Sequence, residues 1–328
     1  MLITALAGGI GGARFLRGLL AELAARDPSG SSLVTVIGNT ADDITLFGMR
    51  VCPDLDTVMY TLGGGIHEEQ GWGRSEETFT VKEELAAYGM EPQWFGLGDR
   101  DFATHIVRSQ MLAAGYPLSQ VTEALCARWQ PGVRLLPMTD DQVESHVIIE
   151  DEQGRRAIHF QEWWVRMHAS TPALSILPVG ADDAKPAPGV LEAIAQADVV
   201  LLPPSNPVVS IGTILAVPGI RDAIAATTAP VVGVSPIIGG APVRGMADAC
   251  LTAIGVETSA TAVGRLYDGL VDGWLVDDAD ADAVGALDGV VVRALPLYMT
   301  DLVATRAIAA AALDLAAELA GGRPSSKP

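Results

Sequence analysis

The sequence is poor in cysteine, in aromatic residues and in positive charge, and each shortage argues against a class of protein. Its three cysteines form no Cys-x-x-Cys pair and leave an odd count, which favours reduced cytosolic thiols over a disulfide framework or a zinc site. Lysine and arginine number 21 against 40 aspartates and glutamates, and the net charge of −19 disfavours nucleic acid and anionic membranes as partners. Runs of about 18 apolar residues are missing, so we expect no membrane span.

Hydrophobic residues, by contrast, make up 49% of the 328 positions, enough for a large buried core. An apolar strand at 2–7 is followed by a glycine-rich turn, a helix and a second strand ending near Asn39. This order is a strand–helix–strand unit and implies a parallel sheet. We therefore predict an α/β fold: a Rossmann-like parallel sheet with helices on both faces and an inserted antiparallel hairpin and helical subdomain.

The rest of the chain extends this pattern, with one change of texture. Alternating polar and apolar residues around a turn near 153–154 indicate an antiparallel hairpin, and we take 133–180 as an inserted subdomain. Thr300–Asp301 has the composition of a helix N-cap. The predicted organisation is one domain over 1–320 with a disordered tail at 321–328, and further local elements are helices near 76–88, 102–114 and 119–129 and a short strand at 94–98.

Four glycines lie between the first strand and the first helix. Glycine here lets a backbone approach phosphate closely, and the free N–H groups of a helix start favour an anion. Arg14 occupies the place of the third glycine of a dinucleotide fingerprint, and the chain has no Gly-Lys-Ser/Thr sequence, which excludes a Walker loop. A tight turn with no ligand is the alternative. The glycines are Gly8, Gly9, Gly11 and Gly12.

Four aspartates fall within fifteen residues of an otherwise apolar stretch. Asp42 and Asp43 follow Asn39 at the carboxyl edge of the second strand, where open α/β sheets bind ligands. Asp54 and Asp56 come just after. Carboxylate oxygens are preferred by Mg²⁺, which takes one or two from protein and others from substrate phosphates. The alternatives are a solvated loop, or Asp54 acting only as the cap of the helix that follows.

The segment 98–109 combines acidic, basic and hydroxyl side chains on one predicted helix face. A polar stripe at this spacing fits a binding surface, although a solvated, salt-bridged face is the alternative. Two later loops, 203–212 and 234–243, each follow an apolar strand and suit a nucleotide or polyphosphate, or are ordinary turns. The paired indoles Trp163–Trp164 are either packing residues or a surface on which a flat ring stacks.

Taken together, these motifs resemble the 2-phospho-L-lactate transferase family of coenzyme F-420 biosynthesis, and most closely its actinobacterial phosphoenolpyruvate transferases. The similar segments, in order, are GGIGGARFL, NTADD, CPDLDTVMYTLGG, LGDRDFATHIVR, LPMTDD, HFQEWW, PPSNPVVSIG and SPIIGGAPVRG, and they span about residues 1–310. The resemblance implies a Mg²⁺-dependent transfer. A guanosine-diphosphate-linked enolpyruvate or lactate would donate its phosphoryl group to the deazaflavin alcohol Fo, giving GMP and dehydro-coenzyme F-420-0 or F-420-0.

The resemblance also implies roles for particular residues. Asp42 and Asp56 would hold Mg²⁺, and Asp56, Arg100 and His105 would take part in catalysis. Substrate contacts would come from three groups: Gly8, Gly9, Gly11, Gly12, Asn39, Asp43 and Asp54 in the first; Asp99, Thr104, Arg108 and Trp164 in the second; Ser205, Asn206, Ser235 and Gly239 in the third.

Two other functions share much of this pattern. A guanylyltransferase that makes the donor needs a triphosphate site, usually with more lysine and arginine than this chain has. A non-catalytic nucleotide-sugar-binding regulator of the same superfamily has no need of the 98–108 segment combined with HFQEWW. We expect the transferase, as a cytoplasmic homodimer, and leave the choice among lactyl, enolpyruvyl and glyceryl donors open.

Overall fold

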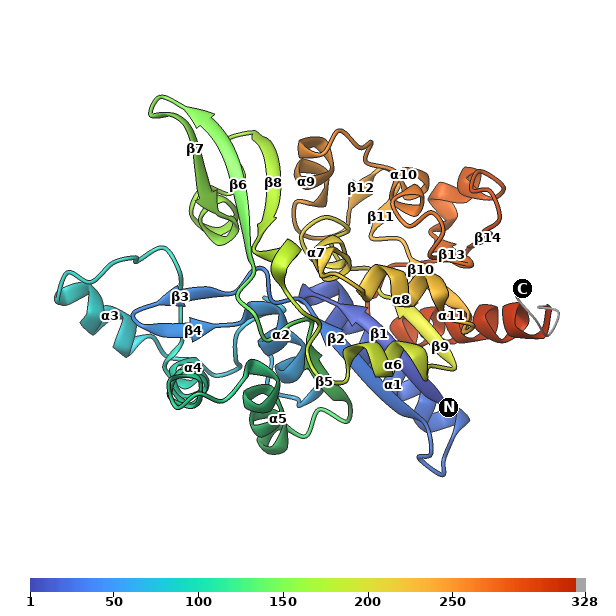
Figure 1. Ribbon diagram of the computed structural model, residues 1–328, viewed down its shortest axis with the longest axis horizontal. Coiled ribbons are helices and arrows are strands. Elements are labelled where there is room, and N and C mark those ends of the chain that lie inside the picture. The colour runs from blue at the N-terminus through green and yellow to red at the C-terminus, as the bar shows by residue number, and fades with distance from the viewer. Residues whose placement is uncertain (323–328) are drawn as a thin grey trace.

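The chain forms an elongated α/β body in the computed structural model, which describes residues 1–322 (Figure 1). Of the predicted disordered tail, residues 321–322 belong to the last helix, and 323–328 lie outside the described residues. Among the described helices, none combines the length and the apolar character that crossing a membrane requires.

A seven-stranded sheet forms the centre, in the order β14-β13-β10-β9-β1-β2-β5, and all of its strand pairs are parallel. The β1–β2 pair is in register from Leu2 opposite Leu33 to Ala7 opposite Gly38. The predicted Rossmann-like parallel sheet is therefore confirmed. In chain order its strands are β1 (Leu2–Ala7), β2 (Leu33–Gly38), β5 (Arg134–Pro137), β9 (Val199–Leu202), β10 (Val231–Val234), β13 (Gly273–Val276) and β14 (Val291–Ala294).

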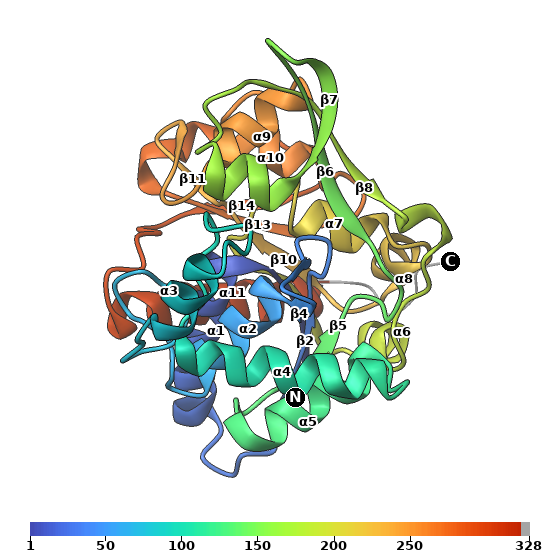
Figure 2. The ribbon, with the colours of Figure 1, turned by 90° about the vertical axis from the view of Figure 1, so that its left-hand side faces the viewer.

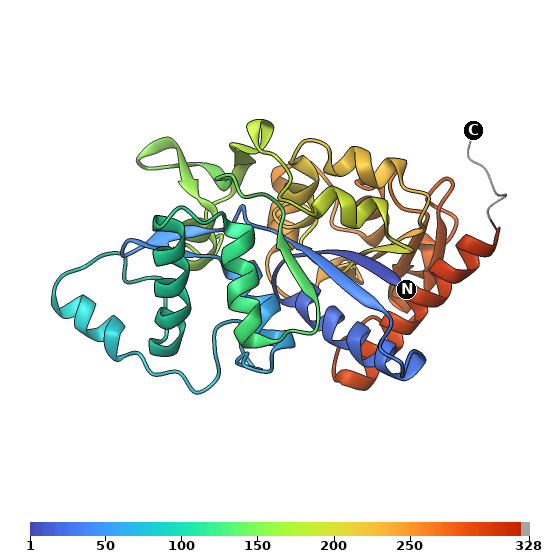
Figure 3. The same ribbon diagram turned by 60° about the horizontal axis from the view of Figure 1, so that its bottom comes forward.

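Helices cover both faces of this sheet, and each face has its own apolar core. Alternate side chains of β1 supply the two cores: Ile3 and Ala5 point to one and Leu6 to the other, which explains the unbroken apolar run of a parallel strand. One core contains α1 (Gly9–Arg26), α2 (Pro53–Leu62), α5 (Leu118–Trp129) and α11 (Leu302–Gly322); the other contains α6 (Val190–Ala195), α7 (Ile211–Ala216), α8 (Ile220–Ala226), α9 (Ala247–Ala253) and α10 (Ala260–Arg265). The layers are visible in Figure 3.

The start of α11 follows the predicted cap, because the Asp301 side chain accepts a hydrogen bond of 2.8 Å from the Ala304 N–H. Several short elements connect these strands and helices. They are the hairpins β3 (Ile44–Leu46) with β4 (Met49–Val51) and β11 (Ile237–Ile238) with β12 (Ala241–Pro242), and the 3₁₀ turns η2 (Ala181–Asp183) and η3 (Asp278–Ala283).

A small lobe lies beyond the β5 side of the sheet, around α3 (Thr80–Ala87) and α4 (Asp99–Ala113) (Figure 2). Its apolar centre joins β3 and β4 to α4 through Leu46, Val51, Leu97 and Phe102. The strand predicted at 94–98 is wrong. Leu97 is buried against this cluster in an irregular segment, and Gly98 is the N-cap of α4, so the segment pairs with no strand.

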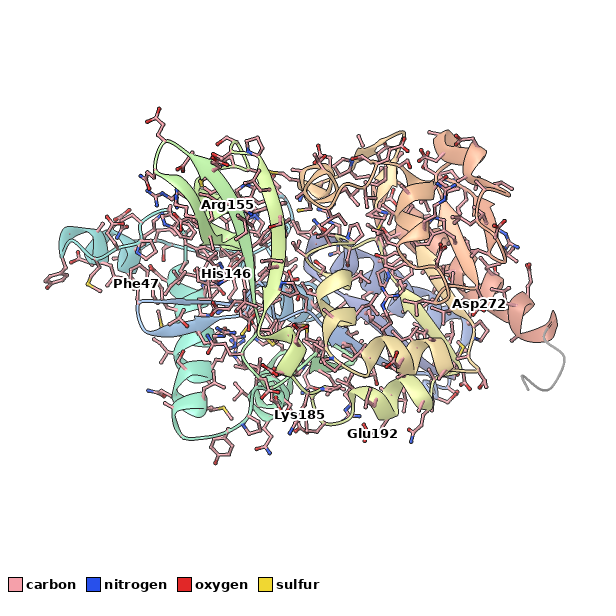
Figure 4. The ribbon with its side chains drawn as sticks, turned by 45° about the horizontal axis from the view of Figure 1, so that its top comes forward. Phe47, His146, Arg155, Lys185, Glu192 and Asp272 are labelled. Carbon is pink, nitrogen blue, oxygen red and sulfur yellow. The ribbon has the colours of Figure 1, made fainter. Side chains whose placement is uncertain are left out.

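The predicted insertion at 133–180 combines two structures. Its first strand, β5, pairs with β2 at the edge of the main sheet. The remainder forms a separate antiparallel sheet in the order β7-β6-β8, with the two-residue turn between Asp151 and Gly154 at the predicted place. Figure 4 labels His146 and Arg155 on the β6–β7 hairpin. These elements are β6 (Glu144–Asp151), β7 (Gly154–His159), the π-helical turn η1 (Glu162–Arg166) and β8 (Ala173–Val179).

Candidate functional site

The strand order places a topological switch point between β1 and β9. From β1 the chain builds outward through β2 and β5 on one side, and from β9 it builds outward through β10, β13 and β14 on the other. Ligands of open α/β sheets bind at the carboxyl ends of strands beside such a point. The segments 8–12, 39–43 and 203–210 follow β1, β2 and β9 there, so three of the predicted motifs meet at one edge.

The glycines after β1 allow α1 to pack directly against neighbouring loops. A Cβ on Gly11 would lie 2.1 Å from the Pro204 carbonyl oxygen, and one on Gly12 would lie 2.6 Å from the Ser205 hydroxyl. Ser205 binds the same turn, accepting from the Gly8 N–H at 3.2 Å and donating to the Gly8 carbonyl at 2.8 Å. At Gly11 and Gly12 the space that a side chain would need is therefore filled by neighbouring protein atoms.

Asp54 faces the start of α1, which bears on the alternative that it only caps its own helix. Its Oδ2 accepts from Asn39 Nδ2 at 2.9 Å, and a Cβ on Gly8 would meet this oxygen at 2.5 Å. The N-cap of α2 is Cys52, which has no side-chain capping bond. Burial raises the pKa of Asp54 to about 6, although hydrogen bonds from Asn39 and the Gly9 backbone oppose the rise. Asp54 thus belongs to the strand-edge site, and the capping interpretation is wrong.

Asp42 and Asp43 are buried at the end of β2 with oxygens that lack hydrogen-bond partners in the described chain. These are Asp42 Oδ1 and both carboxylate oxygens of Asp43. Burial, and next the charge of Asp54, raises the pKa of Asp42 well above its usual value. Burial also raises the pKa of Asp43 to about 7, although Arg50, with Nε 3.4 Å from Asp43 Oδ2, opposes this. Buried carboxylates in this condition favour a cation or a proton.

The segment that ends the antiparallel hairpin contacts the backbone of Asp42 and Asp43. His159, at the end of β7, places Nε2 3.1 Å from the Asp43 carbonyl oxygen. Gln161 donates from Nε2 to the Asp42 carbonyl oxygen at 3.3 Å. The HFQEWW motif thus helps to fix the backbone of the NTADD motif, although 116 or more residues separate them.

Asp56 faces α4 and is paired with an arginine. Its Oδ1 accepts from Arg108 Nη2, and the side chains of both residues are almost fully buried. His105 Nδ1 lies 3.1 Å from Arg108 Nη1. Burial, outweighing the charge of Asp56, lowers the pKa of His105 to about 4, so the imidazole is neutral at pH 7 and its Nδ1 accepts from the guanidinium. Thr104 is buried on the same helix.

Asp101 connects this buried group to a cavity of about 180 Å³. It accepts a hydrogen bond of 2.8 Å from the Tyr60 hydroxyl, and burial, followed by the charge of Asp56, raises its pKa to about 7. Trp72 and Phe79 line the cavity, and both side chains are also partly exposed to solvent. Trp72 and Tyr60 were not among the predicted site residues, although the GWG sequence around Trp72 was the available signal.

Asp99 and Arg100 have a different environment from the rest of their motif. Asp99 is half-buried and accepts from Thr78 Oγ1 at 2.6 Å and from the Val81 N–H at 2.9 Å, so it holds the start of α3. Arg100 forms an ion pair of 2.9 Å with Glu76 at the surface. The predicted polar face therefore divides: its first turn binds the 76–81 segment, and positions 101, 104, 105 and 108 point inward.

The later loops use their polar side chains to shape their own backbone. Asn206 Oδ1 accepts from the N–H groups of Val208 and Val209 at 2.9 and 3.2 Å. Ser235 Oγ accepts from the Ile237 N–H at 3.1 Å and donates to its carbonyl at 2.9 Å. The Gly239 N–H donates to Asp280 Oδ2 at 2.9 Å. Any ligand at these loops would therefore meet mainly backbone groups.

The two indoles after the hairpin separate into different environments. Trp163 is fully buried, and its Nε1 donates to the Thr171 carbonyl at 2.8 Å. It packs with Phe160 and Val147 in the core of the antiparallel sheet and offers no face for stacking. Trp164 is half-buried, next to Phe160 and close to Gly245. Only Trp164 remains available as a contact for a flat ring.

The carboxylates fit Mg²⁺ through one or two protein ligands and not through a complete protein cage. Within residues 1–322 no three histidine, cysteine, aspartate or glutamate side chains are grouped to hold a metal. Mg²⁺ usually takes one or two carboxylates and completes its shell with water and phosphate oxygens. Asp42 meets that condition through Oδ1, which has no hydrogen-bond partner in the described chain, and Asp43 through a carboxylate that Arg50 approaches only at 3.4 Å. Asp56 also has an oxygen without a hydrogen-bond partner there, Oδ2, but its Oδ1 is paired with Arg108.

Known proteins of one family match this chain over nearly its whole length. The family model for 2-phospho-L-lactate transferase CofD matches residues 3–288. A phosphoenolpyruvate transferase of Thermobifida fusca is 75% identical over 97% of this chain and 99% of its own length. Those of Kitasatospora aureofaciens and Mycolicibacterium smegmatis are 69% and 59% identical, covering 98% and 96% of this chain and 100% and 99% of their own lengths.

Solved structures support the fold alone. A UPF0052-family protein from Bacillus halodurans superimposes with a TM-score of 0.60, covering 95% of this chain and 99% of its own, at 20% sequence identity. A second crystal structure from that organism gives a TM-score of 0.61 at 19% identity, covering 95% of this chain and 98% of its own.

Proposed function

Because the chain belongs to the 2-phospho-L-lactate transferase CofD family, we propose that it is a phosphoenolpyruvate transferase of coenzyme F-420 biosynthesis. In this proposal the ribityl hydroxyl of Fo attacks the terminal phosphate of a guanosine-diphosphate-linked enolpyruvate, or of the lactate analogue. The phosphate moves to Fo together with its enolpyruvyl or lactyl group, and GMP is the leaving group. The products are dehydro-coenzyme F-420-0, or F-420-0, and GMP. The observation that carries the proposal is the pair of buried carboxylates Asp42 and Asp43 at the switch-point edge of the sheet, with three oxygens that accept no hydrogen bond within the described chain.

Asp42 and Asp43 would hold Mg²⁺ in this reaction. The bound ion would neutralise the diphosphate and lower the pKa of the acceptor hydroxyl. Asn39 supports the arrangement by holding Asp54 at 2.9 Å while its Oδ1 accepts from Thr213 and the Ala41 N–H. Asp56 was predicted as a metal ligand and base. Its pairing with Arg108 favours a role in fixing α4 against α2.

The acceptor would bind on the α4 side of the site. The cavity between Trp72, Phe79 and Asp101 presents aromatic surface to a flat heterocycle, and stacking of this kind contributes roughly 1–3 kcal/mol. Trp164, in the π-helical turn after the antiparallel hairpin, would offer a second aromatic surface to the acceptor. The donor would lie on the opposite side, along α1 and the loops 203–212 and 234–243. We also expect a cytoplasmic homodimer, which light scattering of the purified protein and fractionation of its host would test.

The function is tested by incubating the purified protein with Fo and the enolpyruvyl or lactyl donor, with and without Mg²⁺. We expect Mg²⁺-dependent release of GMP together with the F-420-0 product. Pyrophosphate release from GTP instead would indicate a guanylyltransferase, and nucleotide binding without turnover would indicate a regulator. Asp42→Asn should lower turnover at least a hundredfold, since it removes a hard ligand. The exposed Asp182→Asn, with the same charge change, should leave turnover unchanged.

A further inference from the structure

Three arginines crowd together at the start of α1, although the chain has only 21 positive residues. Arg14 and Arg17 lie on α1, and Arg244 lies in the loop that follows β12. The ionisable groups acting on Arg14 are Arg244, Arg17 and Glu68. Burial is the main cause of a lowered pKa of Arg14, and the repulsion of Arg244 and Arg17 adds to it. Positive charge is thus concentrated in one place on an acidic protein.

The three guanidinium groups converge on one short loop, 68–70. Arg244 donates from Nη1 to the Gln70 carbonyl and from Nη2 to the Glu69 carbonyl, both at 2.9 Å. Arg14 Nη2 donates to the Glu68 carbonyl at 3.3 Å. The partners of both arginines are neutral carbonyl groups, which fix a guanidinium in place without neutralising it.

Of the two carboxylates in the 68–70 loop, that of Glu68 is occupied. Glu68 makes two contacts with Arg17, at 2.6 and 3.2 Å, in the paired geometry that guanidinium and carboxylate prefer. The charges of Arg17 and Glu68 therefore cancel. Arg14 and Arg244 remain as two positive charges with defined orientations and no opposite charge from the described chain within hydrogen-bond distance.

These charges lie beside the predicted ligand edge. Ile10 is in the first turn of α1, and Gly71 joins it to Arg244. A Cβ on Gly71 would be 2.8 Å from Ile10 and 3.0 Å from Arg244 Nη1. Arg14 is four residues after Ile10 and projects from the same face of the helix. The pair therefore flanks the helix start whose other side meets Asp54.

We propose that Arg14 and Arg244 form an anion clamp that binds the phosphate oxygens of the nucleoside-diphosphate donor. The proposal rests on the proposed function for the identity of the donor. Guanidinium groups suit this task because their fork of N–H donors matches two phosphate oxygens at once. The clamp draws on two segments distant in sequence, so it is complete only when the 239–245 loop is seated against α1.

A purely structural role for these arginines is the competing explanation. Under it, Arg14 and Arg244 would only tie the 68–70 loop to α1, and removing them would loosen the fold without affecting anions. Arg17 already supplies such a tie through Glu68. The two explanations differ in what they predict for ligand affinity, so an experiment can separate them.

The test measures binding of GDP and of inorganic pyrophosphate by calorimetry for the wild type, Arg14→Gln, Arg244→Gln and the double variant. The control is Arg293→Gln, which removes the same charge from an exposed pair with Glu318 on β14 and α11. Each single variant should weaken both ligands about tenfold to a hundredfold, as expected for loss of a charge-assisted contact, and the control should not. In steady-state assays the donor KM should rise while the KM for Fo stays constant.

The outcomes separate this proposal from the proposed function. Wild-type affinity for GDP and pyrophosphate in both single variants, with only a fall in Tm, would overturn the clamp and support the structural role. If the Arg14 and Arg244 variants lose affinity for GDP and pyrophosphate while the Arg293→Gln control does not, the clamp is supported. If the wild type in that case shows no transfer to Fo, the transferase is overturned and the clamp is not. Thermal unfolding of every variant shows whether it is folded at the temperature of the binding measurement.

Discussion

The buried ion pair between Asp56 and Arg108 is expected to stabilise the packing of α2 against α4. Their side chains are 7% and 2% exposed. Removing one partner of such a pair leaves an uncompensated charge in a medium that solvates it poorly, at a cost of about 3–5 kcal/mol. The surroundings make the loss asymmetric. Arg108→Gln would leave Asp56 facing Asp101 with no cation, whereas Asp56→Asn would leave a cation beside two other carboxylates, Asp43 and Asp101.

We therefore expect Arg108→Gln to lower the free energy of unfolding by about 3–5 kcal/mol, and Asp56→Asn by less, about 1–3 kcal/mol. The double variant should lose less than the sum of the two, because the pair is removed together. Urea unfolding followed by far-UV circular dichroism measures all three, with constant m values as evidence that the unfolded states are comparable.

A loss of less than about 1 kcal/mol for Arg108→Gln, the range of an exposed pair, would contradict a stabilising role for this ion pair. So would single losses that add without coupling in the double variant. A matched control is Arg166→Gln, because Arg166 makes an ion pair of 2.8 Å with Glu162 but is 58% exposed. That variant should change stability by no more than about 0.5 kcal/mol. Asp56→Asn is accordingly a poor test of metal binding, since it perturbs the fold as well.

Three further predictions follow from the same structure. Asp101 has a pKa of about 7 in the folded protein, so it is protonated more readily there than in the unfolded chain. Its contribution to stability is therefore present at low pH and is lost as the pH rises through 7. Parallel urea titrations should show Asp101→Asn gaining stability relative to wild type between pH 5 and pH 8. Gly11→Ala should lower the free energy of unfolding by more than about 1 kcal/mol, because its Cβ would meet the Pro204 carbonyl. Gly321→Ala, in open space on α11, should be neutral or should raise stability by up to about 1 kcal/mol. Thermal melts compare the two variants. Trp163→Ala should cost about 3–5 kcal/mol in urea unfolding, and Trp164→Ala should instead weaken Fo binding measured by fluorescence, so equal effects of the two variants on Fo would contradict the placement of Trp163 in the core.

The parallel pairing of the sheet was predictable because the sequence patterns that indicate it are local. The apolar run at 2–7, the glycine turn and the helix that follows define a parallel unit without any knowledge of distant contacts. The cap at Asp301 and the turn before Gly154 likewise depend on a few neighbouring residues. The strand expected at 94–98 failed for the opposite reason. Leu97 is apolar because it packs against Phe102 and α4, and its pattern alone does not distinguish that contact from a strand.

The position of the acidic residues at the sheet edge was predictable from the sequence, and their pairings were not. Sequence places Asp42 and Asp43 at the end of β2, and the structure agrees. It does not reveal that Arg108 neutralises Asp56, since the two are 52 residues apart and the pairing depends on how α4 packs on α2. The separation of Trp163 from Trp164 has the same origin. Adjacent residues on an irregular turn point to different environments, which only the tertiary fold determines.

Charges of both signs lie on the two sides of the first turn of α1, and neither has an ion-pair partner within the described chain. Asp54, whose charge raises the pKa of Asp42, faces Gly8 and Gly9, and Arg244 lies next to Ile10. In a folded protein of marginal stability such groups pair with one another unless the backbone keeps them apart. Here the helix start does so, and a ligand that satisfies both must carry a divalent cation and a polyanion together. A magnesium–nucleoside diphosphate has that charge pattern. Adding GDP with Mg²⁺ should therefore raise Tm more than the separate effects of GDP and Mg²⁺ combined.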